Sequence, residues 1–103
     1  MSVLVEFAMF PTDKSESVSK YVSRIIEMFK NSEINYKLTP MGTVFETDTM
    51  ENALKILLSA YETLEPDCNR IYSTVKFDIR KNKNNRMSQK IKSIEDKIGK
   101  VSL

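Results

Sequence analysis

The chain has 103 residues, of which 41% are hydrophobic and 29% are charged, and its formal net charge is +2. This length and apolar content predict a single domain over residues 1–103 with one hydrophobic core. The balanced charge, and the lack of an apolar run near the roughly 20 residues that span a bilayer, argue against nucleic acid or membrane as a partner.

The first predicted element is a strand. Residues 3–10 read VLVEFAMF and stop at Pro11, a composition typical of a β-strand in which Glu6 is the one charged residue. Apolar residues then recur at three- and four-residue spacing between Val18 and Phe29. This spacing predicts an amphipathic helix over about 16–31.

A hairpin and a second helix follow. Residues 35–47 contain two short β-compatible runs joined through a Thr-Pro-Met-Gly segment, in which proline removes a donor and glycine permits a tight turn. Asp48, with the carboxylate of Glu51 three residues later, predicts the N-cap of a helix. The apolar stripe that continues from Met50 indicates that this helix ends before Pro66.

The last part of the chain predicts a strand, a linker and a helix. Residues 71–80 alternate between apolar and polar side chains, the pattern of a half-buried strand. Residues 81–86 read as a polar linker, and apolar spacing from Met87 predicts a helix that ends near Gly99. The basic stretch from Arg80 to Lys92 is interpreted as solvated.

The order strand, helix, strand, strand, helix, strand predicts an α+β fold of the βαββαβ, ferredoxin-like kind. Two right-handed crossovers would place both helices on one face of an antiparallel sheet with strand order 4-1-3-2, and the C-terminal helix would be an addition to this fold. The other sheet face is then left bare unless something covers it.

Residue types that carry common chemistry are scarce. Histidine is absent and Cys68 is the single cysteine, so the chain lacks the commonest general base and the usual zinc ligands and cannot form an internal disulfide. Two glycines are too few for a glycine-rich phosphate loop. We therefore expect no enzyme activity, metal site or cofactor, and, since no secretory signal is present, a cytoplasmic location.

The alternation of the strands predicts one cluster of polar residues on the open sheet face. Glu6, Glu46 and Lys76 would share this face, flanked by Tyr72, Thr74 and Asp78. Thr43 would lie on the side opposite Glu46 and join only from the turn. The competing interpretation is a solvated or subunit-covered face with cross-strand ion pairs. Apolar residues beside Glu6 favour self-association.

Two other functions of this topology fit the sequence poorly. An RNA-recognition module needs an aromatic, glycine-containing signature on its third strand, whereas residues 43–47 read TVFET and carry an acid. An acylphosphatase-like enzyme would need an arginine, an asparagine and a glycine-rich loop after the first strand, which residues 11–14 do not provide.

Several segments of the chain match a family pattern: VEFAMFP at 5–11, SVSKYV at 17–22, YKLTPMGT at 36–43, RIY at 70–72 and KFDIR at 76–80. Together they resemble the thiamine-binding protein family, and the likeness extends into the last helix. The LTPMGT segment is the most specific part of the match.

This resemblance implies a ferredoxin-like fold, homodimers or homotetramers built through the sheets, and binding of thiamine or its hydroxymethylpyrimidine part near subunit contacts. A carboxylate, a hydroxyl and a backbone amide together can recognise the adjacent donor and acceptor atoms of an aminopyrimidine, and a carboxylate or aromatic face suits a thiazolium cation. The ligand-binding residues expected on this basis are Glu6, Thr39, Met41, Gly42, Thr43, Glu46, Tyr72, Lys76 and Asp78. The alternative is a structural or regulatory homo-oligomer without a small ligand.

Overall fold

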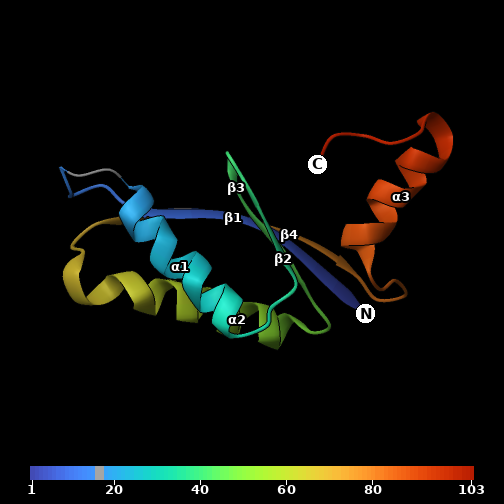
Figure 1. Ribbon diagram of the computed structural model, residues 1–103. Coiled ribbons are helices and arrows are strands. Elements are labelled where there is room, and N and C mark those ends of the chain that lie inside the picture. Colours follow the sequence, from blue (N-terminus) through green and yellow to red (C-terminus); the bar gives the residue numbers. More distant parts are fainter. Residues whose placement is uncertain (16–17) are drawn as a thin grey trace.

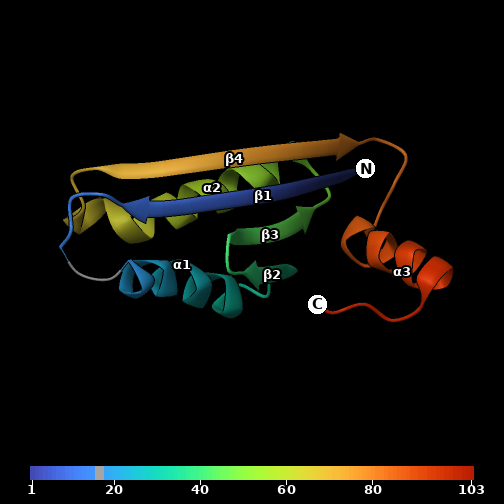
Figure 2. The ribbon, with the colours of Figure 1, turned by 90° about the horizontal axis from the view of Figure 1, so that it is seen from above.

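The computed structural model describes residues 1–15 and 18–103, and its strands form an antiparallel sheet in the order β2-β3-β1-β4. The strands are β1 (Ser2–Pro11), β2 (Tyr36–Thr39), β3 (Gly42–Thr47) and β4 (Ile71–Arg80). The helices are α1 (Ser19–Asn31), α2 (Met50–Leu64), the short 3-10 turn η1 (Glu65–Asp67) and α3 (Arg86–Ile98). The predicted α+β arrangement and strand order are therefore confirmed, and Figure 2 shows the strands side by side.

The ends of the first two helices differ from the sequence prediction. Helix α1 begins at Ser19, and positions 16 and 17, where we expected its start, lie outside the described residues. The N-cap of α2 is Thr49 and not the predicted Asp48. Thr49 has the extended backbone of a capping residue, and its hydroxyl accepts the Asn52 N–H at 3.1 Å.

One face of the sheet and the two crossover helices enclose the core. Figure 1 shows α1 and α2 on the same side of the sheet. Strand β1 sends Val3, Val5 and Phe7 toward these helices, and the Phe7 ring packs against Phe29 and Phe45 with ring centroids 5.8 Å apart. Each side chain of this size contributes about 1.5–3 kcal/mol when it is fully buried. The alternation of β1 therefore provides most of the contact between the sheet and the helices.

Helix α3 lies apart from this core. Figure 1 shows it beyond the end of the sheet, on the side opposite α1 and α2. Its apolar residues Ile94 and Ile98 are exposed, whereas Arg86, the first residue of the helix, is buried. None of the helices in the described part of the chain has the length and apolar character needed to cross a bilayer.

The hairpin between β2 and β3 lies unusually close to β1. A Cβ atom added at Gly42 would be 2.9 Å from the carbonyl oxygen of Phe7, which belongs to the backbone and has no freedom to swing away. A glycine is therefore needed at position 42 because the hairpin backbone lies so close to the backbone of β1. The backbone of Gly42 is not left-handed, so conformational freedom is not the reason for this glycine.

We expect Gly42→Ala to destabilise the protein by about 1–3 kcal/mol, because the hairpin must shift to admit the methyl group. Urea unfolding measures this loss. Ser93→Ala on the exposed side of α3 is the control, and its free energy of unfolding should stay within about 0.5 kcal/mol of the wild-type value. Equal stability of Gly42→Ala and the wild-type protein would show that the hairpin relaxes at no cost.

Candidate functional site

The structure divides the predicted ligand-binding residues between the β2–β3 hairpin and the open face of the sheet. Four of them, Thr39, Met41, Gly42 and Thr43, lie at the hairpin and line a cavity next to α1. The others lie on the open face, at Glu6, Glu46, Tyr72, Lys76 and Asp78. The two-residue period of β3 explains why Thr43 and Glu46 point to opposite sides, as predicted, whereas Thr39, Met41 and Gly42 line the cavity from the end of the hairpin.

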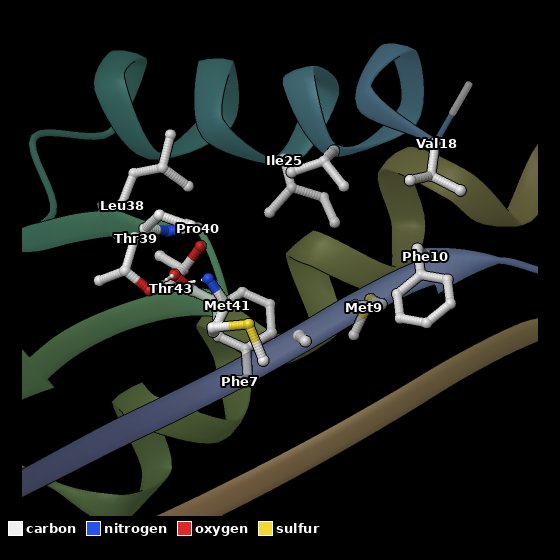
Figure 3. Close-up of a pocket in the computed structure, with 13 residues that line it drawn as sticks. Phe7, Met9, Phe10, Val18, Ile25, Leu38, Thr39, Pro40, Met41 and Thr43 are labelled. Carbon is white, nitrogen blue, oxygen red and sulfur yellow. Dashed lines mark hydrogen bonds between the residues drawn. The ribbon is translucent and has the colours of Figure 1, made fainter.

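The hairpin cavity is enclosed by residues 7–10 of β1, residues 38–43 of the hairpin and the apolar side chains Val18, Val22 and Ile25. Its volume is about 200 Å³. It exists because the hairpin is shorter than β1. Phe7 is the last β1 residue paired with β3, whereas residues 9–11 pair only with β4. The gap beside these residues is covered by α1 (Figure 3).

Few polar groups line the hairpin cavity. The side chains that line it, among the residues the structure describes, are all uncharged. The hydroxyl of Thr39 donates to the carbonyl oxygen of Gly42 at 2.8 Å and accepts the Met41 N–H at 3.2 Å, so it closes the turn. Thr43 is only 5% exposed, and its hydroxyl forms no hydrogen bond with another residue that the structure describes. Its hydroxyl is therefore a donor and acceptor in the cavity lining that the turn does not use.

The open face carries a second, shallower feature, which we call the sheet-face groove: Leu4, Val5, Glu6, Val44, Lys76, Phe77, Asp78 and Lys90 line it. The volume is about 400 Å³. Glu6 and Lys76 are register partners, as predicted, and Nζ of Lys76 is 3.7 Å from Oε1 of Glu6. Both side chains are more than half exposed, so this ion pair contributes little to stability and leaves the carboxylate accessible.

Glu46 is occupied by a structural role. Its carboxylate accepts hydrogen bonds from the hydroxyl of Ser2 at 2.6 Å and from the backbone N–H groups of Arg86 and Met87 at 2.8 and 3.2 Å. The first N–H groups of a helix lack partners within it, and the preceding residue, Asn85, is left-handed and does not cap them with its side chain. A carboxylate from β3 therefore caps α3.

Arg86 contradicts the prediction of a solvated polar linker, because it lies in α3 and is only 3% exposed. Its Nε donates to the hydroxyl of Ser2 at 3.0 Å, and Nη2 donates to the backbone carbonyls of Ser2 and Asp78. Nη1 forms an ion pair with Oδ2 of Asp78 at 2.8 Å. We call Ser2, Glu46, Asp78 and Arg86 the α3 anchor.

The two carboxylates of the α3 anchor are held in the ionised form. Desolvation by itself would raise the pKa of Glu46, but the hydrogen bonds from Ser2, Arg86 and Met87 outweigh it and lower the pKa below its ordinary value. The Arg86 guanidinium and then the Lys90 ammonium lower the pKa of Asp78. Glu46 and Asp78 are therefore less available to a ligand than Glu6 is.

Cys68 is the single thiol of the chain and is buried. Burial, with a smaller contribution from Asp67, raises the pKa of the Cys68 thiol, which favours the unreactive protonated form. Within residues 1–15 and 18–103, no three side chains of the histidine, cysteine, aspartate and glutamate types are grouped to hold a metal ion.

We expect Glu46→Gln to lower the free energy of unfolding at pH 7 by about 1–2 kcal/mol, because a neutral amide caps α3 less well. A carboxyl group whose pKa is lower in the folded than in the unfolded protein stabilises the fold at pH values above its unfolded-state pKa. Acidification removes this stabilisation. The difference in free energy of unfolding between Glu46→Gln and the wild type should therefore shrink as the pH falls below 4.5, the ordinary pKa of a glutamate side chain.

Urea unfolding between pH 3 and pH 7 measures this dependence. Glu51→Gln, at an exposed position that forms an ion pair with Lys55 on α2, is the control and should change stability by about 0.5 kcal/mol or less. A stability loss for Glu46→Gln that stays the same at pH 3 and pH 7 would contradict a role for the ionised carboxylate.

The sequence of this chain is similar to those of known proteins. The chain is 39% identical over 92 residues to a UPF0045 protein of Methanocaldococcus jannaschii, covering 89% of this chain and 91% of that one. It is 30% identical over 95 residues to a UPF0045 protein of Mycobacterium tuberculosis, covering 92% and 93% of the two chains.

Solved structures share the fold. A crystal structure of a hypothetical protein from Methanocaldococcus jannaschii superposes with a TM-score of 0.79 at 37% identity, covering 92% of this chain and 97% of that one. A Thermotoga maritima protein described as a proposed thiamine biosynthesis/salvage protein shares the fold alone, with a TM-score of 0.71 at 18% identity over 95% and 96% of the chains. The family model for thiamine-binding proteins matches residues 5–95, and this chain therefore belongs to the thiamine-binding protein family.

Proposed function

We propose that this protein binds thiamine, or its hydroxymethylpyrimidine part, in the hairpin cavity and does not transform it. The observation that carries the proposal is the position of the LTPMGT segment. Residues 38–43 form one wall of an apolar cavity, and they lie within the segment matched by the family of thiamine-binding proteins.

The size and lining of the hairpin cavity suit one flat heterocycle. Pockets for drug-sized ligands measure about 300–1,000 Å³, so a cavity of about 200 Å³ accommodates a single ring better than a two-ring ligand. Apolar side chains would contact the two ring faces, and the hydroxyl of Thr43 can both donate to and accept from the ring edge. The pyrimidine then occupies the cavity while the thiazolium of thiamine lies at its mouth.

The sheet-face groove is the second candidate position for the ligand, and it lies on the sheet face where the sequence predicts a cluster of polar residues. Its accessible carboxylate, Glu6, would suit a thiazolium cation. Binding there would have to displace Lys76 in water, where hydrogen bonds and ion pairs gain little. Because the hairpin cavity excludes more water, we place the ligand there.

Binding without chemistry is the role that we infer. The chain contains no histidine, and its single thiol, Cys68, is buried and held in the protonated form. Reversible binding needs neither a base nor a nucleophile. We propose a cytoplasmic setting, because the free thiol of Cys68 is compatible with a reducing compartment.

Thiamine and hydroxymethylpyrimidine should both bind the purified protein, and Thr43→Val should weaken binding by about 2- to 10-fold, because it removes one hydrogen-bonding hydroxyl while keeping the shape. Isothermal titration calorimetry measures the affinity. Thermal unfolding of the free variant establishes that the hairpin remains folded.

Glu6→Gln is the matched control, because it removes a charge from the sheet-face groove and leaves the hairpin cavity intact. Its affinity should equal that of the wild type. A loss of binding in Glu6→Gln but not in Thr43→Val would move the ligand to the sheet-face groove. No heat and no thermal shift with either compound would reject the function and favour the homo-oligomer without a ligand.

We also infer that the protein associates with a second copy through the edge of β4. This strand ends the sheet, so the outer row of its backbone groups has no partner strand among the described residues. Next to this edge lies what we call the edge patch, six apolar side chains between 38% and 56% exposed: Leu54, Leu58, Tyr61, Val75, Phe77 and Ile79.

The edge patch is continuous with the free edge of the sheet. The guanidinium of Arg24, on α1, donates to the backbone carbonyl of Thr63, on α2, at 3.4 Å. Thr63 therefore lies on the side of α2 that faces α1. Helical periodicity places Leu58 on the opposite side, toward β4. Edge pairing of two copies about a two-fold axis would satisfy the free backbone groups of β4 and cover both patches.

Phe77→Asp should convert such a dimer to a monomer, because it places a charge within the buried contact. Light scattering coupled to size-exclusion chromatography measures the mass. Ile98→Asp, on the exposed end of α3, is the control and should leave the mass unchanged. A wild-type protein that is monomeric at all concentrations would refute this interface.

A further inference from the structure

Met41 stands out among the six methionines of this chain. It is 87% exposed, compared with 41% for Met1, and the other four are half-buried. Methionine is an apolar residue that proteins usually place inside. Such exposure leaves the thioether sulfur accessible to small oxidants, which convert methionine to its sulfoxide.

The position of Met41 connects this exposure to the hairpin cavity. Its N–H is held by the hydroxyl of Thr39 at 3.2 Å, which fixes the turn from which the side chain projects. Figure 3 shows the side chain extending from the turn toward β1, at the rim of the cavity. The exposed side chains Val18 and Leu38 also belong to this rim, so the entrance is apolar.

The chemistry of the thioether suits contact with a bound ring. Methionine is flexible and polarisable and makes favourable contacts with aromatic rings through sulfur. A sulfoxide is polar and chiral, and its oxygen requires hydration, so it is a poor cover for an apolar cavity.

We propose that Met41 is a reversible oxidation site that controls ligand binding at the hairpin cavity. In the step, hydrogen peroxide transfers one oxygen atom to the sulfur of Met41 and leaves as water. The sulfur is oxidised, peroxide is reduced, and no bond of the chain is broken. The effect on binding rests on the proposed function, whereas the selectivity of oxidation does not.

Peptide mapping by mass spectrometry tests the selectivity. The folded protein is treated with limiting hydrogen peroxide, and the fraction of sulfoxide is measured at each methionine. Met41 should be oxidised first. Preferential oxidation of a half-buried methionine such as Met9 or Met50 would overturn the proposal, whether or not the protein binds thiamine.

Calorimetry with hydroxymethylpyrimidine tests the effect on binding. Oxidised wild-type protein should bind about 3- to 10-fold more weakly than the untreated protein, and methionine sulfoxide reductases A and B together should restore the affinity. Met41→Leu cannot form a sulfoxide at this position, so its affinity should be the same before and after peroxide.

Met9→Leu is the matched control, because Met9 also lines the cavity but is half-buried. This variant should lose affinity on oxidation as the wild type does. Continued loss of affinity in Met41→Leu after peroxide would overturn the role of Met41. Absence of binding before oxidation would reject the proposed function and the control of binding together, while the peptide map would still decide whether Met41 is the oxidation site.

Discussion

The alternation of side chains along β1 is the constraint on which the rest of this structure depends. β1 lies between β3 and β4 and pairs with both of them. Its odd-numbered residues enter the core with α1 and α2, and its even-numbered residues form the floor of the open face. A shift of one residue in its register would exchange the core with the solvent-exposed face.

A mismatch in length beside β1 creates the candidate ligand site. The β2–β3 hairpin ends where Gly42 meets the backbone of Phe7, while β1 continues along β4 for several residues. The sheet therefore has a gap on one side of β1, and α1 covers this gap with apolar side chains. A cavity formed in this way is apolar on most sides and polar only where the turn contributes hydroxyl and backbone groups, which is how small-molecule sites are commonly built.

Polar groups on the open face serve mainly to position α3. Ser2, Glu46 and Asp78 come from three different strands and converge on Arg86, whose guanidinium is buried. A buried charge is costly unless it is paired and hydrogen-bonded, and the α3 anchor provides both an ion pair and several acceptors. Glu46 and Asp78, which the sequence predicts as ligand-binding residues, are therefore partly occupied in holding α3 in place. The hairpin cavity is the better candidate site.

The sequence by itself determined the element order, the strand faces and the hairpin, because these depend on local periodicity and turn chemistry. Alternation correctly separated Thr43 from Glu46 and paired Glu6 with Lys76. Only the tertiary structure decided that Glu46 caps α3, that Arg86 is buried in a stretch that looked solvated, and that the hairpin stops short of the end of β1. These features arise from contacts between residues about 40 to 80 positions apart in the chain, and no local pattern encodes which distant group will satisfy a helix terminus or cover a gap in a sheet.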